Sequence, residues 1–99
     1  MIDQIQELIE WLSKSRPKPA PYRVTDTKRY FRIEHGRSWG AFCFIPKEDF
    51  ETKATGPMKR GGLYMPATFD RPAKHARGDL LNKSSWDMAF GEWGMRYLR

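Results

Sequence analysis

The chain has 99 residues, of which 39% are hydrophobic and 14% aromatic, a composition typical of one globular domain with its own core. The 18 Lys and Arg residues outnumber the 12 Asp and Glu residues, which gives a formal net charge of +6. The single cysteine, Cys43, excludes an internal disulfide and a cysteine-based zinc site, and no apolar run approaches the roughly 18 residues that a membrane helix needs. The sequence therefore predicts one domain over residues 1–99, placed in the cytoplasm and without a membrane partner.

The positive charge is concentrated in two blocks. Residues 14–37 carry a net charge of +6 and residues 52–83 a net charge of +5, whereas residues 1–13 carry −3, residues 38–51 carry −2 and residues 84–99 balance. A basic stripe is the electrostatic footprint of a polyanion partner. The alternative is a charged surface that only keeps the protein in solution.

The first predicted element is an amphipathic helix over residues 2–13. Ile2, Ile5, Leu8, Ile9 and Leu12 recur at helical spacing, with acidic side chains on the opposite face. Prolines at positions 17, 19 and 21 end this helix and form a stiff connector. We expect its apolar side to pack against a sheet.

Three strands are predicted next, at residues 22–25, 30–35 and 39–45. Gly36-Arg37 fits a two-residue hairpin turn between the second and the third strand. The register set by this turn predicts a core face and a mixed face, with Phe31, Ile33, Phe42 and Phe44 on the first and Tyr30, Arg32, Trp39 and Cys43 on the second.

Residues 52–83 are predicted to be basic and largely irregular. Residues 52–62 have the composition of a loop, residues 63–65 form a short strand, and residues 66–83 contain at most one helical turn between Asp70 and Gly78.

Residues 85–98 fit either a strand or a helix. The alternation of Trp86, Met88 and Phe90 favours a strand, whereas Ser84 as N-cap and the apolar stripe from Trp86 to Tyr97 favour a helix. We prefer the helix, although two glycines weaken it. The predicted fold class is thus α+β, with an N-terminal helix, an antiparallel sheet of three or four strands, a long basic loop region and a C-terminal helix.

No group of residues has the spacing of a catalytic or metal-binding motif. His35 and His75 lie far apart, neither belongs to a His/Cys cluster, and no glycine-rich phosphate-binding motif is present. We therefore predict no catalytic residue, no metal site and no small-molecule cofactor.

Three segments are candidates for contact with a partner. In residues 55–62, Lys59 and Arg60 supply charge, and the flanking glycines let backbone N–H groups approach a phosphate; the alternative is a plain solvated loop. If residues 71–77 form a short helix, their basic side chains would lie along one ridge that contacts phosphates. This second set comprises Arg71, Lys74, His75 and Arg77.

The third candidate is the mixed face of the predicted sheet. Tyr30 and Trp39, beside Arg32, could stack on unpaired bases, as aromatic residues do in proteins that bind single strands. The alternative is that the C-terminal helix or the long loop covers this face as a second core layer.

The leading functional hypothesis is a small, basic, nucleic-acid-associated protein that uses phosphate contacts from residues 53–77, assisted by Arg23, Arg29 and Arg32. The second is a small non-enzymatic inhibitor or adaptor, of a kind common in phages and mobile elements, that docks on an acidic or nucleic-acid-handling protein. The third is a metal-independent ribonuclease of the toxin type, for which the residues to test are His75, Glu34, Arg96 and Tyr97.

Overall fold

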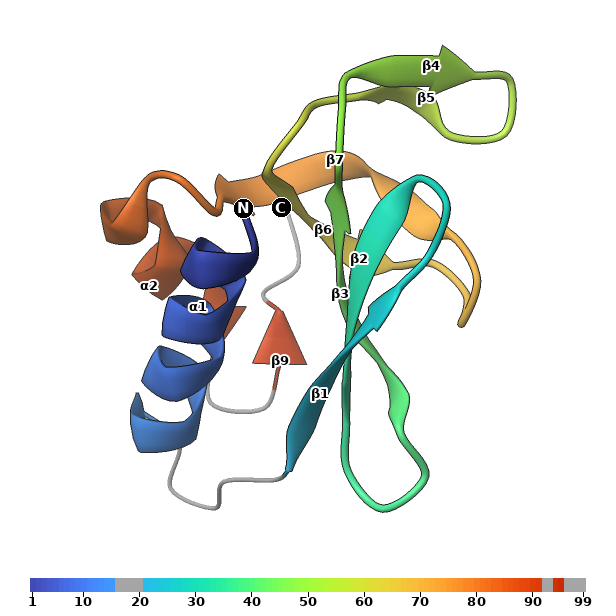
Figure 1. Cartoon of the computed structure of the whole chain (residues 1–99). Helices are drawn as coiled ribbons and strands as arrows, with labels where there is room; N and C mark the ends of the chain where they lie inside the picture. Colours follow the sequence, from blue (N-terminus) through green and yellow to red (C-terminus); the bar gives the residue numbers. More distant parts are fainter. Residues whose placement is uncertain (16–20, 92–93, 96–99) are drawn as a thin grey trace.

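The computed structural model describes residues 1–15, 21–91 and 94–95 (Figure 1). Helix α1 (Ile2–Ser15) packs on an antiparallel sheet with the strand order β1-β2-β3-β6-β7, so the α+β class is confirmed and the sheet has five strands rather than three or four. The strands of this sheet are β1 (Tyr22–Asp26), β2 (Tyr30–His35), β3 (Gly40–Pro46), β6 (Gly62–Pro66) and β7 (Pro72–Asp79).

The remaining elements are short. The hairpin of β4 (Phe50–Thr52) and β5 (Gly56–Met58) is inserted between β3 and β6 and forms a separate two-stranded sheet. A 3-10 turn, η1 (Lys83–Ser85), leads into α2 (Trp86–Ala89), and β8 (Phe90–Gly91) pairs with β9 (Gly94–Met95). Neither α-helix in the described ranges has both the length and the apolar character needed to cross a bilayer.

The main core lies between the sheet and the two helices, which share one side of the sheet in Figure 1. The periodicity of α1 predicts this packing correctly: Ile5, Leu8 and Leu12 are fully buried, and Ile9 is partly buried at the margin. The sheet and the C-terminal segment complete the cluster with residues that include Ile33, Phe42, Cys43, Ile45, Leu63, Leu80, Trp86 and Phe90.

A second, smaller core lies on the other face of the sheet. Phe44 from β3 and Tyr64 from β6 are buried there against Met58 from β5. Tyr30 and Phe50 pack at its edge. The β4–β5 hairpin therefore covers one end of a face that the helices do not reach.

The predicted register of the β2–β3 hairpin is wrong. Phe31 pairs with Ile45 and Ile33 pairs with Cys43, because the turn spans residues 36–39 rather than two residues. The pairing also shifts at a bulge after Ile33, which turns Phe42 to the helix side. Cys43 is consequently in the main core, and Phe44 lies on the opposite face.

Residues 52–83 contain far more regular structure than their composition predicts. The predicted helical turn after Asp70 is absent, and β7 occupies that segment instead. Pairing with β6 satisfies the backbone hydrogen bonds of this polar, glycine-containing sequence, so tertiary context overrides its weak strand propensity.

The segment after Asn82 combines the two alternatives of the sequence analysis. The helix is only α2, and the backbone becomes extended at Phe90. Trp86 and Phe90 are buried as predicted for a core stripe, while Trp93 and Tyr97 lie outside the described residues. Cys43 is fully buried, and this burial raises the pKa of its thiol.

Truncation of Leu8 tests the packing of α1. Leu8→Ala should reduce the free energy of unfolding by about 2–5 kcal/mol, because it removes a fully buried side chain from the main core. Urea denaturation measures the change, with the exposed Glu10→Ala as the control on the same helix. A loss below about 0.5 kcal/mol, the usual limit for surface substitutions, would contradict the assigned core position.

Candidate nucleic-acid interface

The face of the sheet opposite the helices, here called the outer face, carries a set of connected polar contacts. Tyr30, Arg32 and Glu34 alternate along β2, so their side chains point to this face together. Arg23 joins them from β1, where it pairs with Glu34 across the ladder. Phe44 from β3 supplies an apolar neighbour opposite Arg32.

Glu34 organises the polar half of the outer face. Its side chain is 1% exposed, and its two carboxylate oxygens accept hydrogen bonds from the Nε atoms of Arg23, at 2.6 Å, and Arg32, at 2.8 Å. A buried carboxylate persists only when it is paired and hydrogen-bonded. Glu34 therefore fixes two guanidinium groups beside each other.

The same contacts keep Glu34 ionised. Burial by itself would raise the pKa of its carboxyl, but hydrogen bonds from Arg23, Arg32 and Thr25 outweigh it and place the pKa below its ordinary value. The group thus remains a structural anion over the physiological range.

Both guanidinium groups held by Glu34 also stack on aromatic rings. The Cζ atom of Arg23 lies 4.3 Å from the ring centroid of Trp39, and the Cζ atom of Arg32 lies 4.3 Å from that of Phe69. These contacts tie the β2–β3 turn and the β6–β7 turn to the outer face. Such pairs contribute about 0.5–2 kcal/mol each, depending on how far they are desolvated.

Trp39 adopts a strained backbone conformation. Its φ of 52° is the only positive φ of a non-glycine residue in the described part of the chain. Positive φ is uncommon for a bulky residue and costs of order 1–3 kcal/mol. The β2–β3 turn holds this conformation, and the Trp39 ring is thereby brought over Arg23.

A hollow of about 310 Å³ opens beside Arg32. Lys28, Arg29 and Arg32 form its cationic walls, Tyr30 and Phe44 supply aromatic surface, and Thr27 and Asp70 complete the lining. The hollow lies where the β1–β2 turn meets the β6–β7 turn. We call it the aromatic hollow.

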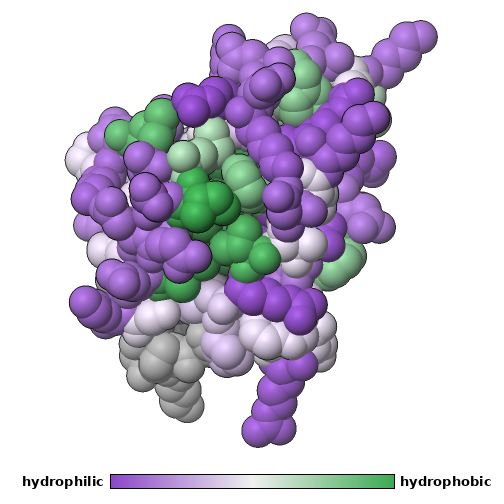
Figure 2. All heavy atoms as spheres, in the orientation of Figure 1, coloured by the Kyte–Doolittle hydropathy of each residue, from purple (hydrophilic) through white to green (hydrophobic). Residues whose placement is uncertain are grey.

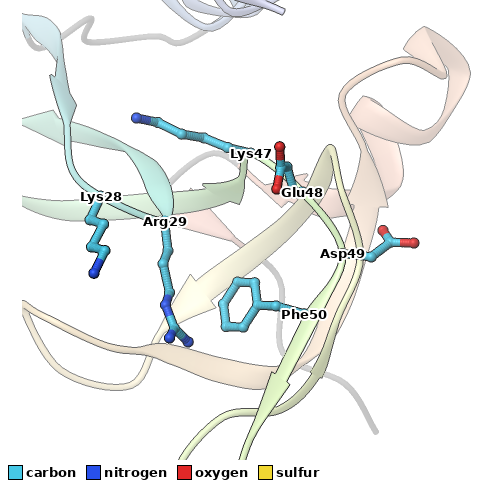
Figure 3. A pocket seen from close by; sticks show the side chains of 6 residues that line it. All are labelled: Lys28, Arg29, Lys47, Glu48, Asp49 and Phe50. Atoms are coloured by element: carbon cyan, nitrogen blue, oxygen red, sulfur yellow. The ribbon is translucent and has the colours of Figure 1, made fainter.

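A second hollow, of about 340 Å³, shares Lys28 and Arg29 with the first. Figure 3 shows the Arg29 and Phe50 side chains extending toward each other, and the Cζ atom of Arg29 lies 4.9 Å from the Phe50 ring centroid. Lys47 and Asp49 point away from this pair in the same view. The β1–β2 turn thus places two cations between two concave surfaces.

Tyr30 links the two hollows. Its ring makes edge contacts with Phe44, at 5.4 Å, and with Phe50, at 5.6 Å between centroids. Burial raises the pKa of Tyr30, although the nearby charge of Arg29 opposes this shift. The phenol is therefore uncharged at neutral pH.

The structure brings together some of the contact residues predicted from the sequence. Arg32 and Tyr30 line the aromatic hollow, and Trp39 stacks at the far end of the outer face. Lys59 and Arg60 lie in the β5–β6 turn, which adjoins the second hollow because the Arg60 backbone N–H donates to Asp49 at 2.7 Å.

The other predicted contact residues form no helical ridge. Arg71 precedes β7, and Lys74 and His75 are exposed on β7, the edge strand at the opposite end of the sheet from β1. Arg77 is half-buried with Nη2 at 3.9 Å from the Met65 sulfur. The prediction of one basic ridge from these four residues is therefore wrong, because the segment is a strand.

Several residues of the site escaped the sequence analysis. Lys28, Phe50, Phe69 and Asp70 come from turns and from the inserted hairpin, and only the fold brings them to Arg29 and Arg32. The one signal available was the clustering of Lys28, Arg29 and Arg32 in the first basic block.

The structure describes two of the four residues named for a ribonuclease. Glu34 is buried between two arginines, His75 lies on the edge strand, and Arg96 and Tyr97 are outside the described residues. Within the described ranges, no group of three or more His, Cys, Asp or Glu side chains could hold a metal ion.

No family model matches the chain, and neither a curated protein nor a solved structure does so. Interpretation of the outer face therefore depends on its own geometry and charge.

The ion pairs of Glu34 with Arg23 and Arg32 predict that the free energy of unfolding depends on pH. Since the folded pKa lies below the ordinary value of 4.5, the stabilisation is fully present above that value and is lost as the pH falls through the folded pKa. Glu34→Gln should cost about 1–3 kcal/mol at neutral pH, because charge-assisted hydrogen bonds are lost in a buried position.

Urea unfolding of both proteins between pH 7 and pH 3 measures this contribution. The variant should lose less stability than the parent as the acid limit is approached. Parallel pH profiles would contradict the role assigned to the Glu34 carboxylate.

Proposed function

We propose that this protein binds nucleic acid, without catalysing a reaction, through the two hollows that adjoin its β1–β2 turn. The observation that carries the proposal is the position of Lys28 and Arg29, which are exposed and line both hollows beside aromatic side chains. Cations next to the partly exposed rings of Tyr30 and Phe50 match the two parts of a nucleotide, because phosphates bind to the charge and nucleobases stack on the rings.

The positive charge of the β1–β2 turn also supports the proposal. Four basic side chains are ion-paired in the described ranges: Lys47 with Asp26, Lys83 with Glu7, and Arg23 and Arg32 with Glu34. Lys28 and Arg29 form no ion pair within the described parts of the chain. They can therefore neutralise phosphates without first breaking an ion pair.

The phosphate-binding region thus shifts relative to the sequence-based hypothesis. Lys59 and Arg60 remain candidate contacts, since their turn adjoins the second hollow, whereas Lys74 and His75 lie on a distant edge strand. The basic side chains of residues 53–77 consequently form two separate groups. Only Lys59 and Arg60, in the β5–β6 turn, belong to the proposed interface. The expected site of action is the cytoplasm.

A second candidate function, an adaptor that docks on another protein, has one observation in its favour. Figure 2 shows apolar side chains gathered in a depression between α1 and the neighbouring strands. Partly exposed members of the main core include Ile9, Val24 and Phe31. Exposed apolar patches of this kind often mark protein contacts.

The proposal predicts a local effect of charge. Lys28→Glu/Arg29→Glu should weaken binding of a labelled single-stranded oligonucleotide at least about tenfold, because two charge-assisted phosphate contacts are lost. It should also reduce the slope of log affinity against log salt by about one to two. Fluorescence anisotropy at a series of salt concentrations measures both quantities.

The matched control is Lys14→Glu/Arg37→Glu, which changes the net charge equally at two exposed positions that line neither hollow, one on α1 and one in the β2–β3 turn at the other end of β2 from Tyr30. It should retain most of the affinity. Equal losses in both double variants would mean that binding follows net charge alone, and no binding by the parent protein would remove the proposal in favour of the adaptor.

A further inference from the structure

The geometry of the aromatic hollow points to a more specific ligand, and we infer that it seats one unpaired base of a single-stranded nucleic acid. This inference rests on the proposed function and deepens it. The phosphates flanking that base would lie on Lys28 and Arg29, while the base itself would enter the hollow beside Tyr30 and Arg32.

The dimensions of the hollow suit a single nucleoside. Its volume of about 310 Å³ is at the lower end of the range for pockets that hold small ligands, about 300–1,000 Å³. Tyr30 offers a partly exposed ring there, and Phe44 forms the buried apolar floor. A flat, aromatic group fits this combination better than a bare phosphate, which gains nothing from the rings.

Arg32 is prepared for stacking before any ligand arrives. Its side chain is 13% exposed, its Nε donates a hydrogen bond to Glu34, and its Cζ atom lies 4.3 Å from the centroid of the Phe69 ring. Because these contacts already fix the side chain, little rotamer entropy remains to be lost on binding. Phe69 is 47% exposed, so part of its ring is open to a second base.

The hollow also contains one carboxylate beside its three cations. Asp70 lies 3.7 Å from Arg32 Nη1 with a side chain that is 87% exposed, so this ion pair is loose. A carboxylate accepts hydrogen bonds from the amino groups of bases, such as N4 of cytosine. Asp70 can therefore contact the pairing edge of a seated base.

A duplex cannot use this arrangement. Its bases are stacked on one another and paired, so their ring faces and pairing edges are unavailable unless a nucleotide is extruded at a cost of a few kcal/mol. Sites that combine a basic track with aromatic platforms are typical of proteins that bind single strands. Heparin and duplex DNA would meet only the cations.

The deciding experiment uses the unaltered full chain and three polyanions of equal length: oligothymidylate, the same strand with abasic sugars throughout, and a duplex. At one salt concentration, the strand with bases should bind about 5- to 150-fold more tightly than the abasic strand, the gain expected for one stacked base. A 2-aminopurine placed in the strand should lose fluorescence on binding, because stacking on an aromatic ring quenches it.

Variants then assign this gain to the hollow. Tyr30→Leu retains an apolar side chain but removes the ring, and it should reduce the difference between the normal and the abasic strand. His75→Leu is the control at an exposed ring outside the hollow. Circular dichroism verifies that both variants are folded. If Tyr30→Leu does not fold, the comparison of the normal and the abasic strand on the parent protein remains decisive.

Each outcome separates the two claims. Equal affinity for the normal strand, the abasic strand and the duplex would overturn the seated base while leaving the proposed nucleic-acid binding intact. A preference for bases that survives Tyr30→Leu in a folded variant would overturn the assignment to this hollow. Failure of all three polyanions to bind would overturn both claims.

Discussion

A carboxylate removed from water must have its oxygens satisfied, and in this protein that requirement arranges a whole face of the sheet. Glu34 draws Arg23 from the neighbouring strand and Arg32 from its own strand into hydrogen bonds through their Nε atoms. The Arg23 guanidinium contacts the ring of Trp39 in the β2–β3 turn, and the Arg32 guanidinium contacts the ring of Phe69 in the β6–β7 turn. Two turns that are distant in sequence are thus connected through one buried charge, and the aromatic hollow owes its wall at Arg32 to the same interaction.

The bulge at Phe42 divides the apolar residues of β3 between two cores. Without it, strict alternation would place Phe42 and Phe44 on the same face. With it, Phe42 joins the helix side while Phe44 supports the hairpin of β4 and β5 on the other side. The outer face consequently has an aromatic end and a charged end, and the two hollows lie at the aromatic end.

Much of the fold could be predicted from periodic patterns, and the site could be predicted only in part. The N-terminal helix follows from the helical spacing of its apolar residues, and β2 follows from alternation. The hairpin register does not, because Gly36 fits turns of two lengths and a bulge leaves no mark in the sequence. Strand β7 could not be predicted from its polar residues, since it forms by pairing with β6. Phe50 and Phe69 approach Arg29 and Arg32 only in the folded chain, so no spacing rule could associate them.

The two outer edges of the five-stranded sheet, on β1 and β7, pair with no strand in the described part of the chain. Open edges can recruit strands from other molecules, and proteins discourage this with charged residues, prolines and irregular pairing. Strand β7 has all three: Lys74 is exposed, Pro72 lacks a backbone donor, and its ladder with β6 is interrupted twice. Lys74, which lines neither hollow, is thus one of three features of β7 that disfavour edge-to-edge pairing with a second molecule.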